Sequence, residues 1–216
     1  MTITTSADGG AAVRGQRLPR TQRRAQLLAA AREVFVSQGY HAAAMDDIAD
    51  RAGVSKPVLY QHFPSKLDLY LALLDAGVEA LVAAVQHALD STQDNKLRVT
   101  ATIAAYLEFV DDSDGAFRLV FESDLMNEAA VRERVDRADD ACAHLVSRVI
   151  AADTGLTGAE AMLLASGLTG LAQTAARHWL RSGGEVPKDL AARLVGGLGW
   201  RGISGFPLSH PPQSPV

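Results

Sequence analysis

The chain has 216 residues, of which 48% are hydrophobic and 21% are charged, a composition typical of a soluble globular protein that buries a core of its own. Its single cysteine, Cys142, excludes disulfides within the chain and fits a reducing, cytoplasmic compartment. The net charge of −4 divides unevenly, because residues 1–66 hold nine basic and five acidic groups whereas the remainder holds twelve and twenty. A basic segment on an acidic body suits a protein that contacts phosphate at one end, and a solvated basic helix is the alternative.

Abundant alanine and leucine, few aromatic residues and apolar side chains at helical spacing predict an all-α fold of about nine helices. No uncharged run reaches the roughly 18 residues of a membrane span, so we expect no membrane contact. The first three helices are expected at residues 21–38, 45–52 and 56–63. Gly39 is expected to end the first helix, because glycine tolerates positive φ, and Gly53 to form the turn before the third.

Hydroxyl and acidic residues mark the starts of several predicted helices. Ser55 is the expected N-cap of the third helix. Ser65 with Asp68, and Thr157 with Glu160, have the spacing of a capping box at the start of two longer helices. The remaining six helices are expected at about 66–89, 96–111, 116–125, 128–152, 158–182 and 187–198, followed by an irregular tail.

The run from Ile48 to Ser55 predicts a helix-turn-helix. Two helices that cross through a three-residue turn need a small residue at the crossing, here Ala49, and backbone freedom in the turn, here Gly53. The second helix then presents hydrogen-bonding groups that suit phosphates and base edges of DNA. A helical hairpin in an ordinary bundle is the alternative, but it does not explain why these groups gather in the basic third of the chain. The exposed positions would be Ser55, Lys56, Val58, Tyr60, Gln61 and His62.

The stretch Gln26–Lys66 resembles the DNA-binding domain of TetR/AcrR-family regulators. The residues that carry the resemblance are Ala31-Arg32-Glu33-Val34-Phe35, Gly39-Tyr40, Met45-Asp46-Asp47-Ile48-Ala49, Ala52-Gly53-Val54-Ser55 and Leu59-Tyr60-Gln61-His62-Phe63-Pro64-Ser65-Lys66. The resemblance implies an all-helical, dimeric and usually repressive protein, which small molecules release from its operator by binding in a divergent C-terminal domain. It also implies four parts: a flexible basic arm (1–19), a helix-turn-helix domain (20–66), an effector-binding and dimerisation domain (67–200) and the tail (201–216).

The resemblance implies two kinds of DNA contact. The residues that would face bases or the groove are Ser55, Lys56, Val58 and Gln61, and those that would hold phosphates are Tyr60, His62 and Lys66. Met45 and Pro57 complete the predicted DNA-binding set. The sequence departs from the family pattern in two places. Ala42-Ala43-Ala44 offers no hydroxyl to cap the second helix and touch phosphate, and Pro57 removes one backbone donor. Basic residues before and within the first helix could reach a minor groove or phosphates, or form a solubilising arm: Arg14, Arg17, Arg20, Arg23 and Arg24.

The C-terminal half contains candidate residues for a dimer interface and a ligand pocket. The apolar helices expected at 158–182 and 187–198 predict an interface of two close-packed copies, with the core of a monomer as the alternative. The candidate interface residues lie on the first of these helices: Leu164, Gly167, Leu168 and Leu171. Larger side chains could line a cavity for an unknown apolar or amphipathic effector, with core packing as the alternative for each: Tyr106, Phe109, Phe117, Phe121, Met126 and Trp179.

We predict no catalytic residue, metal site or cofactor. The glycines at 197, 199 and 202 have the spacing of a dinucleotide-binding loop but lack the strand and helix that such a loop needs, and the histidines lack metal-ligand spacing. The sequence therefore predicts a sequence-specific regulator, a dimeric repressor released from DNA by a small molecule. The competing hypotheses are an all-helical enzyme, for which no catalytic cluster is visible, and a protein that coats DNA regardless of sequence.

Overall fold

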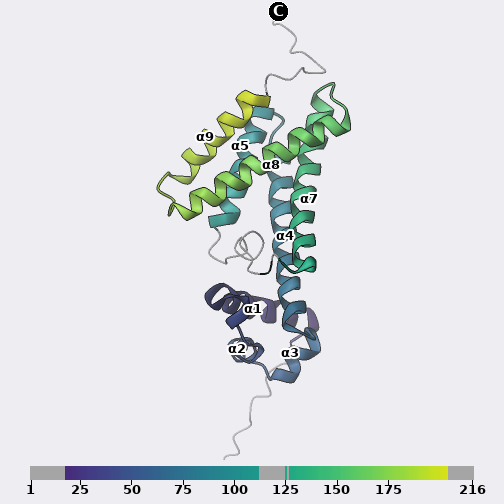
Figure 1. The fold of residues 1–216 in the computed structure, drawn as a ribbon, viewed down its shortest axis with the longest axis vertical. Helices are drawn as coiled ribbons and strands as arrows, with labels where there is room; N and C mark the ends of the chain where they lie inside the picture. The colour runs from purple at the N-terminus through teal and green to yellow at the C-terminus, as the bar shows by residue number, and fades with distance from the viewer. Residues whose placement is uncertain (1–17, 112–124, 126, 204–216) are drawn as a thin grey trace, which may run out of the picture.

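The computed structural model describes residues 18–111, 125 and 127–203, and these residues form eight α-helices without a strand (Figure 1). The helices are α1 (Arg20–Ala42), α2 (Met45–Arg51), α3 (Lys56–His62), α4 (Lys66–Asp90), α5 (Asn95–Asp111), α7 (Ala129–Asp153), α8 (Gly158–Arg181) and α9 (Lys188–Ile203). The all-α prediction is confirmed. The helix expected at 116–125 lies outside the described residues except for Leu125, and α9 runs five residues beyond its expected end.

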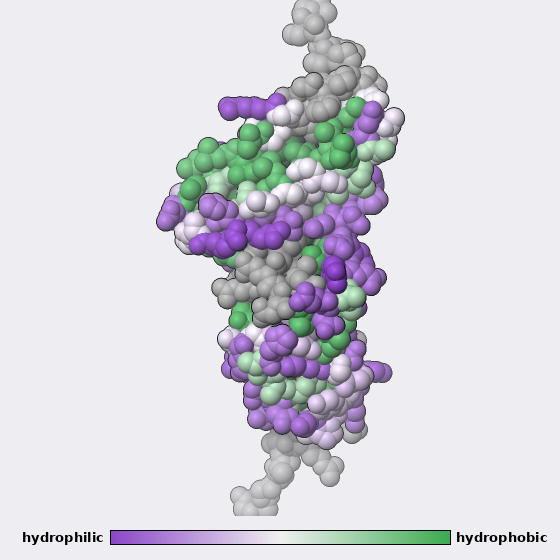
Figure 2. Space-filling view, viewed as in Figure 1, coloured by the Kyte–Doolittle hydropathy of each residue, from purple (hydrophilic) through white to green (hydrophobic). Residues whose placement is uncertain are grey.

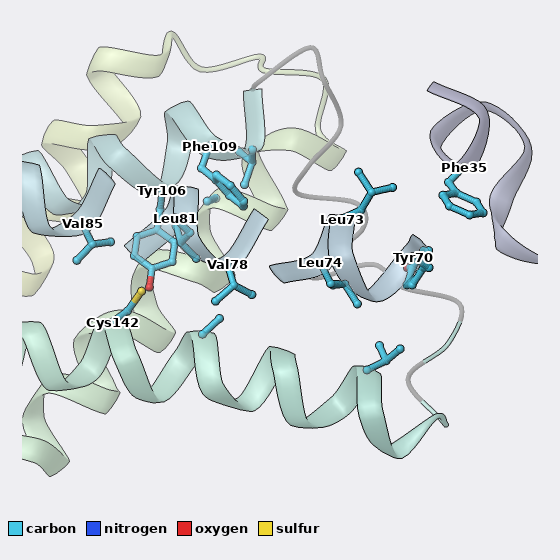
Figure 3. Close-up of a cluster of buried hydrophobic side chains, with 14 of the residues drawn as sticks. Phe35, Tyr70, Leu73, Leu74, Val78, Leu81, Val85, Tyr106, Phe109 and Cys142 are labelled. Atoms are coloured by element: carbon cyan, nitrogen blue, oxygen red, sulfur yellow. The ribbon is translucent and has the colours of Figure 1, made fainter. Parts of the chain in front are cut away.

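The helices gather in two groups that α4 connects. Helices α1, α2 and α3 gather at the start of α4 at one end of the molecule, and α5 and α7 pack against its other half (Figure 1). Helix α8 packs on α5 and α7, and α9 packs on α5 and α8. Helix α4 buries an apolar stripe along its length, including Leu69, Leu74 and Leu81, which have no exposed surface. Figure 3 shows this stripe running from the aromatic pair Phe35 and Tyr70 to the side chains that α5 and α7 contribute.

Glycines with positive φ shape the small N-terminal group. Gly39 (φ 77°) breaks α1 near its end, and the chain completes one more turn before Ala43, so the expected stop becomes a kink. Gly53 (φ 63°) forms the turn between α2 and α3, as predicted. The capping box at the start of α8 is confirmed in full, because Thr157 and Glu160 bond reciprocally. The one at the start of α4 is confirmed in part, because the backbone N–H of Asp68 donates to the Ser65 hydroxyl.

Helix α9 packs antiparallel along α5. Near the start of α9, Lys188 donates to Asp111 at 2.7 Å, and further along α9 Gly196 lies against Thr100. A Cβ atom at Gly196 would lie 2.8 Å from the Thr100 hydroxyl oxygen and 3.0 Å from its Cα, so the two helices approach as closely as a missing side chain allows. The glycines with dinucleotide-loop spacing lie inside this helix, which supports the interpretation that they bind no nucleotide.

Replacing Gly196 by Ala is expected to loosen α9 from α5. The added methyl group meets backbone and Cβ atoms that cannot move aside cheaply, and overpacking of this kind costs about 1–3 kcal/mol of unfolding free energy. The measurement is the urea midpoint of the full chain. The matched control is Gly197→Ala on the same helix, where a Cβ atom meets nothing within 4 Å and alanine favours the helix. An equal change in both variants would contradict the close approach.

Candidate nucleic-acid interface

The turn between α2 and α3 has the tight backbone that a helix-turn-helix requires. The Gly53 N–H donates to Asp50 O at 3.0 Å, and the Val54 N–H donates to Ala49 O at 3.0 Å. Ala49 is only 3% exposed, so the small residue of the predicted motif is buried. These two hydrogen bonds reverse the chain within a few residues and bring α3 against α2.

Helix α3 buries one side and presents the other to solvent. Leu59 has no exposed surface, and Phe63 directly after the helix is 2% exposed. The predicted DNA-contacting positions lie on the opposite side. Ser55, Lys56, Pro57, Tyr60 and Gln61 are exposed, and Val58 and His62 are half-buried. The outward surface of α3 therefore carries hydroxyl, amide and ammonium groups, as the spacing predicted. The expected full exposure of Val58 and His62 is wrong, because both side chains are partly covered by the domain.

Ser55 precedes α3 but does not cap it with its side chain. Its hydroxyl accepts no cap hydrogen bond, and its carbonyl oxygen instead accepts the Val58 N–H at 2.9 Å. Pro57 lies in the first turn of α3, where its missing N–H removes no helical hydrogen bond. The side-chain cap expected at Ser55 is therefore absent, and this exposed hydroxyl is available to an external partner.

Two residues of the predicted DNA-binding set have structural roles that the sequence did not reveal. Met45, at the start of α2, is only 8% exposed and belongs to the core of the N-terminal group. The Lys66 ammonium donates to the carbonyl oxygens of Tyr40 at 2.8 Å and Ala43 at 2.9 Å, and lies 4.5 Å from the centre of the Tyr40 ring. Lys66 thus joins the end of α1 to the start of α4, while its contact with phosphate stays a prediction.

Side chains on α1 hold this helix against the other two. The Gln26 amide donates to Ala52 O at 2.8 Å and accepts from Arg23 at 2.8 Å. The Arg24 guanidinium lies 4.4 Å above the centre of the Phe63 ring. Arg23 and Arg24, two candidates for a DNA-contacting arm, are therefore helical and have partners within the protein. Arg20 is the first residue of α1, and Arg14 and Arg17 lie outside the described residues.

Ion pairs neutralise further cations of the N-terminal group. Lys56 pairs with Asp46 at 2.7 Å, and the hydrogen bond from Lys56 to this carboxylate raises the pKa of the lysine. Arg51 pairs with Glu33 across α1 and α2. Both pairs are more than half exposed, so they contribute little to folding. Lys56 stays charged at neutral pH and can exchange its exposed partner for a phosphate or a base.

An aromatic cluster joins the N-terminal group to the rest of the molecule. Tyr40 stacks on Phe35 and meets Tyr70 of α4 edge-on, with ring centroids 5.8 Å and 5.2 Å apart. Burial and the nearby Glu128 carboxylate raise the pKa of Tyr40. Glu128 directly precedes α7, so the end of α1 lies close to the beginning of the helix that runs beside α4.

The predicted ligand-pocket residues occupy several different environments. Tyr106 and Phe109 are 1% and 8% exposed and belong to the core in Figure 3, where the Tyr106 hydroxyl points toward Cys142. Burial raises the pKa of the Cys142 thiol to about 11, so this cysteine is unsuited to redox sensing. The Trp179 indole N–H donates to Val186 O at 2.6 Å. Phe117, Phe121 and Met126 lie outside the described residues.

The described residues do contain an apolar cavity, which lies nearer the far end of α4. Its free volume is about 80 Å³, and its walls come from five helices and the turn after α7. Of the predicted pocket residues that the structure describes, Tyr106, Phe109 and Trp179, none lines this cavity, because apolar residues that close a cavity and those that fill a core look alike in a sequence. The lining residues are Leu89, Asn95, Arg98, Val99, Thr102, Ile103, Val146, Val149, Ile150, Asp153, Thr154, Leu168, Thr169 and Trp200.

Helices α8 and α9 together expose an apolar surface, visible as the green area over these helices in Figure 2. Of the predicted interface residues, Gly167 is exposed, but Leu164, Leu168 and Leu171 are half-buried. Leu168 and Leu171 reach α9, since a Cβ atom at Gly199 would lie 3.4–3.5 Å from their methyl carbons. The leucines that do face solvent, which we call the α8–α9 face, are Leu163, Leu190, Leu194 and Leu198.

Within the described ranges, no group of three or more histidine, cysteine or acidic residues is placed to hold a metal ion. No helix there combines the length and apolar character needed to cross a membrane.

Known proteins resemble this chain over most of its length. The profile of the bacterial regulatory proteins of the tetR family matches residues 27–73. The transcriptional activator FasR of Mycolicibacterium smegmatis is 47% identical over 91% of this chain and 90% of its own. A TetR-like regulator from Rhodococcus sp. RHA1 is 31% identical, with a TM-score of 0.69 over 88% of this chain and all of that one. The regulator FadR of Bacillus subtilis, solved with stearoyl-CoA, has a TM-score of 0.67 over 81% of this chain and 96% of its own, at 17% identity.

Exchanging Lys66 for Met is expected to destabilise the protein by about 1–3 kcal/mol, because the carbonyl groups at the end of α1 lose their donor while staying partly buried. The measurement is chemical unfolding followed by circular dichroism. Lys56→Met is the matched control, since it removes an equal charge from an exposed pair, and we expect its unfolding midpoint to match the wild type. A Lys66 variant as stable as the wild type would contradict the structural role of this lysine.

Proposed function

The chain belongs to the tetR family of bacterial regulatory proteins, and from this premise we propose that it binds an operator in double-stranded DNA as a homodimer and regulates transcription there. The observation that carries the proposal is the division of α3 into a buried apolar side and an exposed polar side. That division is what a helix needs in order to enter the major groove while it stays attached to its own domain.

The exposed groups of α3 suit two kinds of contact. We propose that Gln61, whose amide can both donate and accept, contacts a base edge, with Ser55 and Lys56 beside it. Tyr60 and His62 lie further along the helix and would donate to phosphates, which fixes the helix in the groove without selecting a sequence. His62 is half-buried, so its imidazole has fewer possible orientations than the exposed groups.

A homodimer is proposed because a single α3 offers too few contacts. The helix has seven residues, whereas specific DNA interfaces bury on the order of 1,000 Å² or more of protein surface. Two copies about 34–36 Å apart would place an α3 helix in successive major grooves. The α8–α9 face supports this proposal, since Leu163, Leu194 and Leu198 are 75%, 60% and 62% exposed on adjacent helices. A second copy would bury these leucines in a bundle of four helices.

For the direction of regulation, we propose activation rather than the repression expected from the sequence. The support is the 47% identical relative, which is named an activator and matches along nearly the whole chain. Nothing in α3 or in its surroundings distinguishes the two outcomes, because the same bound dimer recruits or excludes polymerase according to where its operator lies. An operator upstream of the promoter supports activation, and one that overlaps the promoter supports repression.

We further propose that a small apolar or amphipathic molecule regulates DNA binding. The support is the mostly apolar cavity at the far end of α4, since α4 also carries the DNA-binding group at its start. The FadR regulator of Bacillus subtilis, whose fold this chain shares, was solved with stearoyl-CoA, an amphipathic ligand. An effector would act through its different affinities for the DNA-competent and DNA-incompetent conformations. Release from DNA and stabilisation on DNA are both compatible with this mechanism.

The DNA-binding proposal is tested by footprinting the purified protein on DNA around its own gene, followed by titrations of two variants. Gln61→Ala is expected to weaken operator binding by about 1–3 kcal/mol and random DNA far less. Tyr60→Phe removes only a phenolic hydroxyl and should weaken operator and random DNA by the same factor. Equal affinity of the wild type for operator and random DNA would support a sequence-indifferent coating protein instead.

The dimer is tested by Leu194→Asp, which places a charge in the middle of the α8–α9 face. We expect sedimentation at the mass of a monomer, with unchanged helical content, because an unpaired carboxylate cannot be buried between two copies. Leu97→Asp is the control, since Leu97 is a comparably exposed leucine (54%) on α5. The dimer proposal fails if the wild type sediments as a monomer, and the α8–α9 face is excluded if the Leu194 variant remains dimeric.

A further inference from the structure

Thr102 on α5 carries an unsatisfied hydroxyl in the wall of the apolar cavity. The residue is 8% exposed, and among the described residues its Oγ1 is the one fully buried side-chain oxygen or nitrogen atom without a hydrogen-bond partner. Buried polar groups are nearly always paired, because leaving one unpaired costs free energy comparable to a lost hydrogen bond. An orphaned hydroxyl beside a cavity therefore needs an explanation that the protein alone does not supply.

Other threonines nearby show that the bond could have been made within the chain. Thr169 lines the same cavity, and its hydroxyl donates to Ala165 O, four residues earlier in α8, at 3.1 Å. Thr100, two residues before Thr102 on α5, donates to Lys96 O in the same manner at 3.2 Å. Thr102 alone among the three leaves this bond unmade. Because Oγ1 itself has almost no accessible surface, it would reach a molecule in the cavity by a rotation of the side chain about χ1.

Among the residues that the structure describes, the wall of the cavity offers no free positive charge. Arg98 is the cation in its wall, and the guanidinium already donates to Leu89 O and Thr92 O through Nε and to Gln93 through a terminal nitrogen. Its other terminal nitrogen donates to Asn95 and pairs with the carboxylate of Asp153 at 3.3 Å. A negatively charged group entering the cavity would find no cation to pair with and would lose its hydration, which is costly.

We propose that the cavity binds a neutral, mainly apolar ligand group with one hydrogen-bond acceptor, such as a ketone or ester carbonyl, to which the Thr102 hydroxyl donates. An acceptor is favoured over a donor because orphaned donors are rarer in proteins than acceptors with a spare lone pair. The proposal rests on the proposed function in one respect, that this ligand would be the effector. The Thr102 hydroxyl would make the cavity bind a carbonyl compound more tightly than a hydrocarbon of the same size.

The experiment compares three six-carbon probes on the full-length protein: methyl butyl ketone, hexane and hexanoate. Binding is followed by tryptophan fluorescence, since Trp200 lines the cavity and Trp179 does not. Thr102→Val keeps the shape and removes the hydroxyl. We expect it to weaken ketone binding by about threefold to tenfold, the worth of one neutral hydrogen bond, and to leave hexane binding unchanged or tighter. Hexanoate is expected to bind the wild type at least about tenfold more weakly than the ketone does.

Thr169→Val is the matched control in the same wall, because its hydroxyl is already bonded to its own helix. It should leave ketone affinity unchanged, and Thr102→Ser, which keeps a hydroxyl, should retain the ketone preference even if the valine variant folds poorly. The proposal is overturned if Thr102→Val binds the ketone as the wild type does, if Thr169→Val weakens it equally, if hexanoate binds as well as the ketone, or if no probe binds. Operator binding by ligand-free Thr102→Val is measured separately, so failure of DNA binding is distinguishable from failure of ligand selection.

Discussion

The proposed DNA-facing surface depends on the burial of Leu59, with Phe63 beside it. Helix α3 has seven residues, and isolated helices shorter than about 12 residues are marginal in water, so its shape and direction come from packing. Leu59 anchors the helix from within, and Phe63, covered by the Arg24 guanidinium, fixes its end. Because a helix with one face buried cannot rotate about its axis, the direction in which Gln61 points is set by these apolar contacts.

The positive charge of the N-terminal group is used in two ways. Arg24 and Lys66 hold α1 against the end of α3 and the start of α4, and Arg23 bonds to Gln26 within α1. Lys56 instead forms an exposed pair. A surplus of basic residues in the sequence therefore overstates the charge that the domain can offer to phosphates. The consequence is a modest electrostatic contribution from each copy of the chain, which is consistent with the proposal that two copies bind together.

The helices could be predicted from the sequence, whereas the contacts between residues far apart in the chain could not. Helical spacing, Gly53 and the pair Ser65–Asp68 act within a few residues, so the DNA-binding group followed from local rules. The structural role of Lys66 could not be predicted, because its carbonyl partners lie more than 20 residues earlier in the chain. The cavity could not be found for a similar reason. Its walls combine residues from α4 to α9, and nothing in the sequence distinguishes Thr102 from the bonded Thr100.

Helix α4 connects the cavity to the N-terminal group as one continuous helix. Its 25 residues span about 38 Å at 1.5 Å per residue, with Lys66 at one end and the cavity-lining Leu89 at the other. For a rigid rod of that length, a tilt of about 5° at one end displaces the opposite end by roughly 3 Å, comparable to the separation of adjacent base pairs. In the proposed dimer, a tilt of this size that starts from repacking around Leu89 would take the two α3 helices out of phase with the pitch of a duplex.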